Sequence, residues 1–428
     1  MNYENFKSES TYSKSLFKHN IMFYVLNGFL FTIMMNLFKP FTAKFLYRIG
    51  GSDFHISLLN ALPGLVAVFS TIPGILIIND TINKRKTMNK FFFSSRLFIL
   101  LFAAIPLLPI KYQPIIFVIL ISLKQYPESV SVTSLQSFTG DIFPEQKRAT
   151  AISSRNMFSI IAQLMTVLLV DYILKHFGKT NNIILKIYQI FFIVSFLIGL
   201  IEIYTFSKLK ENSQSSINRN SNNHKKSIFY YLMKTPEVIL STKNNKKYWV
   251  FILCSLIYHF GWQMGWPLFS IYQIKYLGAD EHWIAIISIV SSITMFFCYK
   301  FWNVLIDKKG NPPVMAVTTL GMAATPLLYA FSPNLKILAT VSVISAFFTS
   351  GTVTVLLNSL LEVTPDKDRI FYVGIHVTLT SITLSIAPIV GNIIQNHFSI
   401  YFALYASAFF RLLGSIAFFI RNRKVNLF

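Results

Sequence analysis

Residues 77–87 read IINDTINKRKT, and residues 304–313 read VLIDKKGNPP. Each stretch places an aspartate, Asp80 or Asp307, directly after a long apolar run. Asn83 or Gly310 follows three residues later, with lysines beside it. An aspartate can cap a neighbouring helix, and Asn or Gly tolerates a left-handed turn. Both stretches therefore predict the same kind of basic turn between two long apolar helices.

A second pair of stretches shows the same repetition. Residues 141–148 read DIFPEQKR, and residues 362–369 read EVTPDKDR. Both follow the order acid, two residues, Pro, acid, two residues, Arg, which gives Asp141, Pro144, Glu145 and Arg148, then Glu362, Pro365, Asp366 and Arg369. Two pairs in one order at nearly one offset indicate a duplicated chain. IGGSD at 49–53 and LGADE at 277–281 form a weaker third echo.

The composition places the apolar runs in a membrane. The 428 residues are 53% hydrophobic and only 13% charged, with a mean hydropathy of +0.52. Runs long enough to cross about 30 Å of hydrocarbon as helices lie at 19–46, 55–79, 91–110, 114–138, 150–175, 184–206, 248–274, 283–306, 313–332, 336–361, 371–396 and 400–421. We therefore expect an all-α integral membrane protein with twelve transmembrane helices in two pseudo-symmetric six-helix halves.

A polar stretch after the sixth run divides the chain. It begins near Ser207 and contains ENSQSSINRNSNNHKK, followed by SIFYYLMKTPEVIL and STKNNKK. The middle segment is too short to span and is flanked by lysines, which favours an amphipathic helix on the membrane surface. We expect an N-terminal half at 1–206, a cytoplasmic linker at 207–247 and a C-terminal half at 248–428.

The net charge of +22 reflects membrane topology. Lysines and arginines crowd the loops on one side, whereas the opposite loops hold only Arg48, Lys111, Lys179 and Lys275. Cytoplasmic loops carry such an excess, so both termini are expected in the cytoplasm of a multi-pass protein of the cell membrane. Because the basic residues lie between apolar runs, nucleic acid is not an expected partner.

These features resemble the major facilitator superfamily, over essentially the whole chain. The family's loop after span 2 runs Gly, Asp four residues on, Arg, a Gly turn and Arg or Lys. This chain keeps Asp80, with Leu76 at the leading Gly. The second copy, with Asp307, Lys308 and Gly310, fits better. The resemblance implies alternating access, in which the halves rock around a midplane cavity and loop charges latch one conformation. The implied latch residues are Asp80, Lys84, Arg85, Asp141, Arg148, Asp307, Lys308, Gly310, Glu362 and Arg369.

Charges inside the membrane are candidate functional groups, since they are costly to insert. Lys124 and Glu128 stand one helical turn apart around Pro127, near the middle of span 4. A carboxylate beside a lysine could exchange its ion pair for a proton or a charged substrate. The alternatives are a fixed structural pair or a snorkelling lysine. Arg96 lies near the end of span 3 and is also expected to snorkel.

Span 7 offers a second group of candidates in YHFGWQMGWP, residues 258–267. His259, Trp262, Gln263 and Trp266 crowd around two glycines, as in a cavity for an amphipathic organic molecule. The alternative is an aromatic belt at the membrane interface. Asn27 in span 1 and Asn358 in span 10 are further substrate candidates, although most polar residues at this depth only bond a neighbouring helix.

Motifs for other functions are missing from the sequence. It contains no GxxxxGK phosphate loop, no HExxH and no Cys/His cluster. We expect no enzyme activity, no cofactor and no metal, and a chain that acts as a monomer. The function expected first is proton-coupled transport of a small organic solute, with export slightly favoured. The alternatives are uptake of a nutrient or peptide-like solute, or a membrane-embedded enzyme or lipid-handling protein on the same scaffold.

Overall fold

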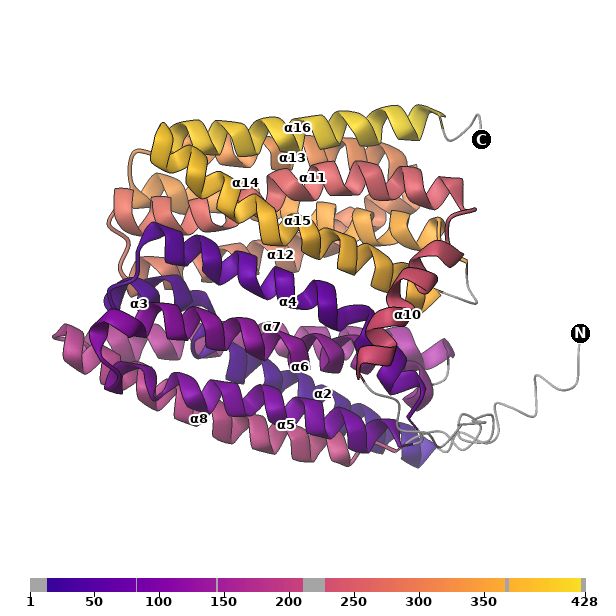
Figure 1. The fold of residues 1–428 in the computed structure, drawn as a ribbon, viewed down its shortest axis with the longest axis horizontal. Coiled ribbons are helices and arrows are strands. Elements are labelled where there is room, and N and C mark those ends of the chain that lie inside the picture. Colours follow the sequence, from indigo (N-terminus) through magenta and orange to yellow (C-terminus); the bar gives the residue numbers. More distant parts are fainter. Residues whose placement is uncertain (1–13, 82, 144, 211–227, 366–368, 425–428) are drawn as a thin grey trace, which may run out of the picture.

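The computed structural model describes residues 14–81, 83–143, 145–210, 228–365 and 369–424. All regular secondary structure in this part of the chain is helical, and twelve long helices run along a common axis (Figure 1). The first half contains α2 (Lys14–Asn36), α4 (Asp53–Asn79), α5 (Lys84–Phe102), α6 (Gln113–Ile142), α7 (Glu145–Phe177) and α8 (Asn181–Ser207). The second half contains α11 (Lys246–Ile271), α12 (Glu281–Lys309), α13 (Asn311–Ala330), α14 (Leu335–Glu362), α15 (Arg369–His397) and α16 (Ile400–Lys424).

Eleven of these helices are long and apolar enough to cross a membrane, which confirms the expected fold class. The remaining long helix is α11, whose 26 residues would extend over about 39 Å at 1.5 Å per residue. Its segment YHFGWQMGWP carries a histidine, a glutamine and two tryptophans. A helix of this length within the bundle completes the twelve spans predicted from the sequence.

Both ends of the described chain lie at one end of the bundle, which distinguishes its two ends. The terminal end is where α2 begins and α16 ends, at the right of Figure 1. The far end is the opposite one, where the short helix α3 (Thr42–Arg48) ends and α4 begins. The linker contains a further helix, α10 (Ile228–Ser241), which packs against α4 at the terminal end.

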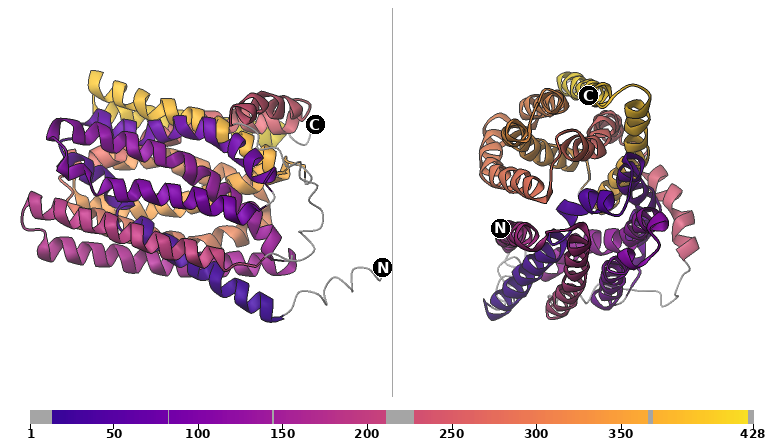
Figure 2. Two further views of the ribbon diagram at one scale, coloured as in Figure 1. Left: turned by 60° about the horizontal axis from the view of Figure 1, so that its bottom comes forward. Right: turned by 90° about the vertical axis from the view of Figure 1, so that its left-hand side faces the viewer.

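The halves meet along two helix pairs. The helix α4 packs along α15, and α7 packs along α12 (Figure 2). These are the second and fifth helices of each half, so the two contacts are related by the internal repeat. Two seams along a pseudo-symmetry axis leave the space between the halves free to form a cavity.

Aromatic packing stabilises the first half near its far end. Phe45, Phe102, Phe117, Tyr188 and Phe192 are buried and meet largely edge to face, with ring centroids 4.9–6.5 Å apart. Such pairs contribute about 0.5–1.5 kcal/mol each beyond their burial. They fix α3, α5, α6 and α8 to one another at this end of the half.

Close backbone contact stabilises the second half. The helices α11 and α16 approach so closely that a Cβ added to Gly414 would lie 2.5 Å from the Cα of Tyr258. Small residues allow this approach, which is a common way for helices to associate in lipid. Gly414 therefore determines the separation of these two helices.

Gly414→Val should lower the unfolding temperature of the purified protein. Overpacking of a tight contact costs about 1–3 kcal/mol, because a neighbouring backbone cannot yield as a side chain can. The control is Leu413→Val, since Leu413 lies on the same helix but is 38% exposed. Equal unfolding temperatures for the two variants, measured by intrinsic fluorescence in detergent, would contradict the assigned packing.

Candidate functional site

A cavity of about 930 Å³ lies between the two halves. Its wall takes residues from α2, α4, α6 and α7 of the first half and from α12 and α15 of the second. The polar members of the wall are Thr32, Asn36, Lys39, Thr71, Gln125, Glu128, Ser129, Gln163 and Ser288. Most of the polar groups belong to the first half, whereas the second contributes mainly Val373, Gly374 and Val377. An enclosed space that combines apolar wall with convergent polar groups can serve as a small-molecule site.

Lys124 and Glu128 form an ion pair on α6. Their side chains are only 7% and 14% exposed, and Glu128 lies on the cavity wall. The pair predicted from their spacing is therefore present, with its acidic member facing the space between the halves. A carboxylate in this position can exchange a proton with the cavity, whereas Lys124 does not line the cavity wall.

A second ion pair lies deeper in the first half. Arg96 Nη2 is 3.1 Å from Glu202 Oε2, and both side chains are 1% exposed. Asn27 Nδ2 donates to Glu202 Oε1 at 2.9 Å. The expectation that Arg96 snorkels to the membrane surface is therefore wrong, because a buried carboxylate neutralises it where it stands. Asn27, one of the substrate candidates, is fully buried and bonds to α8.

The span 7 candidates are bonded mainly to α15. Gln263 Nε2 donates to the Thr380 carbonyl at 3.1 Å, and Gln263 Oε1 accepts from Thr383 Oγ1 at 2.6 Å. His259 Nδ1 lies 3.1 Å from Ser255 Oγ, which lies 2.8 Å from His376 Nε2. These contacts describe a polar seam between two helices of the same half.

The remaining candidates lie on either side of this seam. Trp262 and Trp266 contact each other at 6.4 Å between centroids, and Trp266 is 39% exposed. Asn358 is half-buried on α14. As far as the described residues define it, the cavity wall contains neither these residues nor His259 and Gln263.

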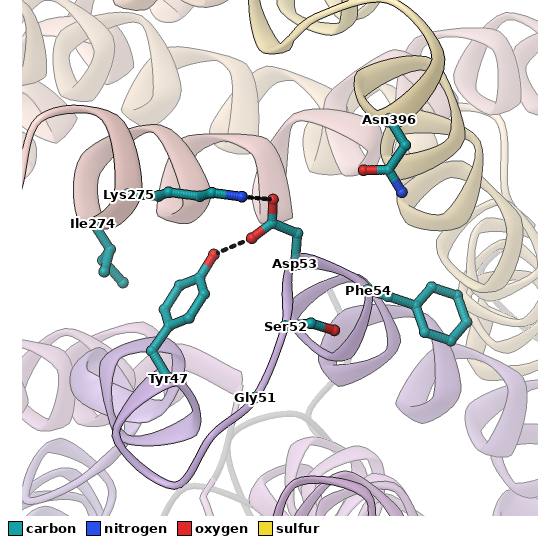
Figure 3. Close-up of a pocket in the computed structure, with 8 residues that line it drawn as sticks. All are labelled: Tyr47, Gly51, Ser52, Asp53, Phe54, Ile274, Lys275 and Asn396. Carbon is teal, nitrogen blue, oxygen red and sulfur yellow. Dashed lines mark hydrogen bonds and ion pairs between the residues drawn. The ribbon is translucent and has the colours of Figure 1, made fainter.

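The far end holds a set of ion pairs between the halves that the sequence analysis did not identify. Asp53, at the start of α4, accepts from Lys275 Nζ at 2.8 Å and from Gln395 Nε2 at 2.7 Å, both from the second half. It also accepts from Tyr47 at 2.8 Å (Figure 3). Tyr47, Asp53 and Lys275 line a pocket of about 610 Å³. The hydrogen bond that Lys275 donates to Asp53 raises the pKa of Lys275, so the ammonium stays charged.

Glu281, at the start of α12, mirrors this arrangement. It accepts from Arg48 Nε at 2.5 Å and from Arg48 Nη2 at 2.8 Å, in a two-pronged pair. Asp53 and Glu281 are the acidic ends of the IGGSD and LGADE echoes. The internal repeat was thus the signal that could have identified them. Each acid binds a cation from the other half, so two reciprocal pairs join the halves at the far end.

Two further contacts cross between the halves at the far end. Lys44 Nζ donates to the Ala279 carbonyl at 2.7 Å. His282 Nδ1 lies 2.9 Å from Asp171 Oδ1, joining α12 to α7. Together with the reciprocal pairs, they join the two halves at the far end.

The residues expected to form a latch lie at the terminal end. Arg85 Nη1 donates to the Leu209 carbonyl at 2.6 Å, and Glu362 Oε1 accepts from Asn311 Nδ2 at 2.5 Å, each within its own half. Asp307 and Lys308 are exposed at the end of α12, and Gly310 has the expected positive φ of 79°. Lys84, Arg148 and Arg369 lie at the same end, and the side chain of Asp141 is outside what the structure describes.

Asp80 is bonded to the linker helix. Its Oδ2 accepts from the Tyr231 hydroxyl at 3.1 Å. Burial, together with the charge of Asp80 and the hydrogen bond to it, raises the pKa of Tyr231 to about 12. The phenol is therefore a permanent donor at physiological pH, and α10 is held against the turn after α4. Asn83, expected to adopt a left-handed turn, instead caps α5 by accepting from the Lys86 N–H at 3.0 Å.

A family model and one curated relative match the sequence. The model described as Major Facilitator Superfamily matches residues 21–255 and 251–427. The tetracycline resistance protein, class H, of Pasteurella multocida is 32% identical over 123 residues. That match covers 28% of this chain and 30% of the relative, so the chain matches less than a third of the relative's length.

Several solved structures share the fold along nearly the whole chain. A bacterial homolog of the human lysosomal transporter Spinster, inward-facing and occupied, has a TM-score of 0.68 and 12% identity, covering 96% of this chain and 98% of its own. The nucleoside transporter NupG has a TM-score of 0.67 and 12% identity, covering 94% and 98%. A D-xylose–proton symporter has a TM-score of 0.66 and 14% identity, covering 93% and 96%.

The family model extends over both halves, and the solved structures reproduce the fold with its two halves. The chain therefore belongs to the Major Facilitator Superfamily and is a multi-pass membrane transporter, not an enzyme.

Proposed function

We propose that this chain is a proton-coupled carrier of small organic solutes that works by alternating access. One observation supports this proposal above the others: the Lys124–Glu128 ion pair lies at membrane depth, with Glu128 on the wall of a cavity shared by both halves. An ionisable group in this position is costly, and transporters use such groups as proton or ion sites. The solute and the proton would meet in the same space.

Glu128 is the proposed coupling group. As a carboxylate it is held by Lys124, and on protonation it releases that lysine from the pair. Only one of these two forms leaves a free cation beside the cavity, so binding of a proton and binding of a solute are linked. Because each residue is the ion-pair partner of the other, both belong to the proposed coupling site.

Export is the favoured direction. The curated relative that matches over 123 residues is named for resistance to tetracycline, which supports export of an organic compound. The alternative is uptake of a nutrient or peptide-like solute, and a solved structure of similar fold is titled a proton symporter for D-xylose. Export and uptake would use the same cavity. They differ in whether the proton and the solute cross the membrane in opposite directions or in the same direction.

We also propose that the terminal end faces the cytoplasm of the cell membrane. The excess of Lys and Arg in the loops at that end supports this orientation. The reciprocal pairs of Asp53 and Glu281 then close the outer side, and the conformation is inward-facing. Outward opening requires both pairs to separate.

The two pairs differ in strength. Lys275 is 55% exposed, so its pair with Asp53 contributes at most about 1 kcal/mol. Arg48 and Glu281 are 19% and 6% exposed and bond through two atoms each. Hydrogen bonds between charged groups contribute about 1.5–3 kcal/mol, so this pair dominates closure of the far end.

Glu128→Gln should abolish solute-driven proton flux. Proteoliposomes containing a pH-sensitive dye would be exposed to a panel of organic solutes, tetracycline and D-xylose included. Flux in the variant is expected to fall at least tenfold, because the amide cannot take up a proton. Glu237→Gln is the matched control, since Glu237 makes the same charge change on the exposed face of α10.

Folding must be separated from coupling in this test. Glu128→Gln leaves Lys124 buried without a partner, which can cost about 3–5 kcal/mol of stability. The double variant Lys124→Gln, Glu128→Gln removes both charges and should fold, yet remain inactive. Full flux in either variant would show that the pair is structural and that coupling occurs elsewhere.

The double variant Arg48→Gln, Glu281→Gln should open the far end. Loss of about 1.5–3 kcal/mol from one conformation shifts a two-state equilibrium by at least tenfold. Spin labels on cysteines introduced at Lys179 and Lys336, with Cys254 and Cys298 replaced by Ser, would report the distance between the halves. A longer distance is expected to gain population.

The charge-reversed variant Arg48→Glu, Glu281→Arg serves as the control. It restores the pair with its polarity inverted, so the short distance should return. An unchanged distance distribution in the Gln double variant would mean that helix packing alone holds the far end closed.

A further inference from the structure

The first span is broken at the cavity. The helix α2 ends at Asn36, and the chain continues through the short 3-10 helix η1 (Lys39–Phe41) into α3. Pro40 lies in η1 and cannot donate a backbone hydrogen bond. Non-helical backbone at membrane depth is tolerated where it lines a cavity, and both Asn36 and Lys39 lie on the cavity wall. The break therefore places Lys39 at the cavity.

Lys39 has no partner among the described residues. Its side chain is exposed to the cavity, and no described residue forms an ion pair or a hydrogen bond with its ammonium. The nearby cation Lys124 repels it, as Lys39 repels Lys124. A lysine at this depth is normally paired, so the missing partner is the unusual feature.

Among the described residues of the cavity wall, Lys39 and Glu128 are the ones that carry charge. Glu128 is neutralised by Lys124, and Glu202 by Arg96. Asp53 and Glu281 are occupied at the far end by Lys275 and Arg48. Lys39 is thus the cation on the described wall that a ligand can neutralise.

The surroundings of Lys39 fit an anion with an apolar body. Gln125, on the same wall, has a side-chain amide that makes no described hydrogen bond and can donate to an oxyanion. Phe31, Met35, Val132 and Val377 supply apolar wall. A carboxylate or similar head would sit at Lys39 and Gln125, and a hydrocarbon or aromatic body against the apolar residues.

We propose that the central cavity selects organic monoanions and that Lys39 is the residue that binds the anionic group. This inference rests on the proposed carrier function, of which it specifies the substrate class. The specificity is one of charge: a neutral or cationic solute of the same shape would leave Lys39 without a counter-charge. Alternating access then carries a solute whose charge the protein itself compensates.

The test measures binding by three probes of one shape. The anion 2-naphthoate, the neutral 2-naphthamide and the cation 2-naphthylmethylammonium would be titrated by calorimetry into the full chain in phosphatidylcholine nanodiscs. Naphthoate should bind at least tenfold more tightly than the other two. In Lys39→Gln its affinity should fall at least tenfold, while that of the amide stays unchanged. Lys39→Arg should remain within about threefold of wild type, since it keeps the charge.

The controls separate charge at the cavity from charge in general. Lys179→Gln makes the same charge change at an exposed position of the far end and should bind naphthoate as wild type does. Thermal unfolding of each variant verifies that it is folded. The proposal is overturned if naphthoate binds no better than the amide, if Lys39→Gln retains the preference, or if no probe binds.

Anionic lipid shares the chemistry of an anionic head on an apolar body, so the nanodisc composition forms a second arm. Addition of phosphatidylglycerol should leave the naphthoate affinity unchanged if the ligand is a soluble anion. A competitive loss of affinity would identify the lipid headgroup as the anion held by Lys39.

Binding of naphthoate without solute-driven proton flux would contradict the proposed coupling but would leave the anion site supported. Solute-driven proton flux without a preference for anions would support the carrier function and contradict the anion site.

Discussion

The structure depends on one constraint: hydrocarbon does not solvate a charge, so a charge within the bundle must be compensated by a counter-charge or by polar groups around it. Arg96 meets Glu202 and Lys124 meets Glu128, all in the first half. Arg411, in the second half, has no described carboxylate partner and is surrounded by carbonyls of Gly261, Met322 and Trp262 at 3.0–3.3 Å. Ion pairs thus compensate Arg96 and Lys124 in the first half, whereas backbone carbonyl oxygens compensate Arg411 in the second. This asymmetry explains why the ionisable wall of the cavity belongs to the first half.

The same constraint separates permanent contacts from those that must change. Arg96–Glu202 is enclosed within one half, so rocking of the halves leaves it intact. The pairs of Asp53 and Glu281 join different halves and lie where water can reach Lys275 and Arg48 once the halves separate. Their charges can therefore be rehydrated when the pairs break. Ion pairs between the halves are therefore tolerated at the ends of the bundle. The seams at its middle are formed mainly by apolar packing and by neutral hydrogen bonds, such as Gln163–Ser292 at 2.8 Å.

Sequence reasoning predicted what depends on local spacing. The spans followed from apolar run lengths, and the Lys124–Glu128 pair from two residues one turn apart. It failed where partners are far apart in the sequence: Arg96 meets Glu202 across 106 residues, and Arg48 meets Glu281 across 233. Nothing local distinguishes a snorkelling arginine from a paired one. The IGGSD and LGADE echo carried the missing information, because a residue repeated at symmetric positions near the axis between the halves tends to contact the other half.

The repeat also explains why closure of the far end is uneven. Duplication supplied equivalent acids at the starts of α4 and α12, but the cations have since diverged. In the aligned echoes, Arg48 corresponds to Tyr276, and Lys275 to Tyr47, so each half contributes its cation from a different position. Arg48 reaches Glu281 with two nitrogens in a mostly buried setting, whereas Lys275 reaches Asp53 as a single exposed ammonium. A planar guanidinium loses less freedom per bond than a flexible lysine. The Glu281 side therefore forms the stronger contact, and separation of the halves should begin at Asp53.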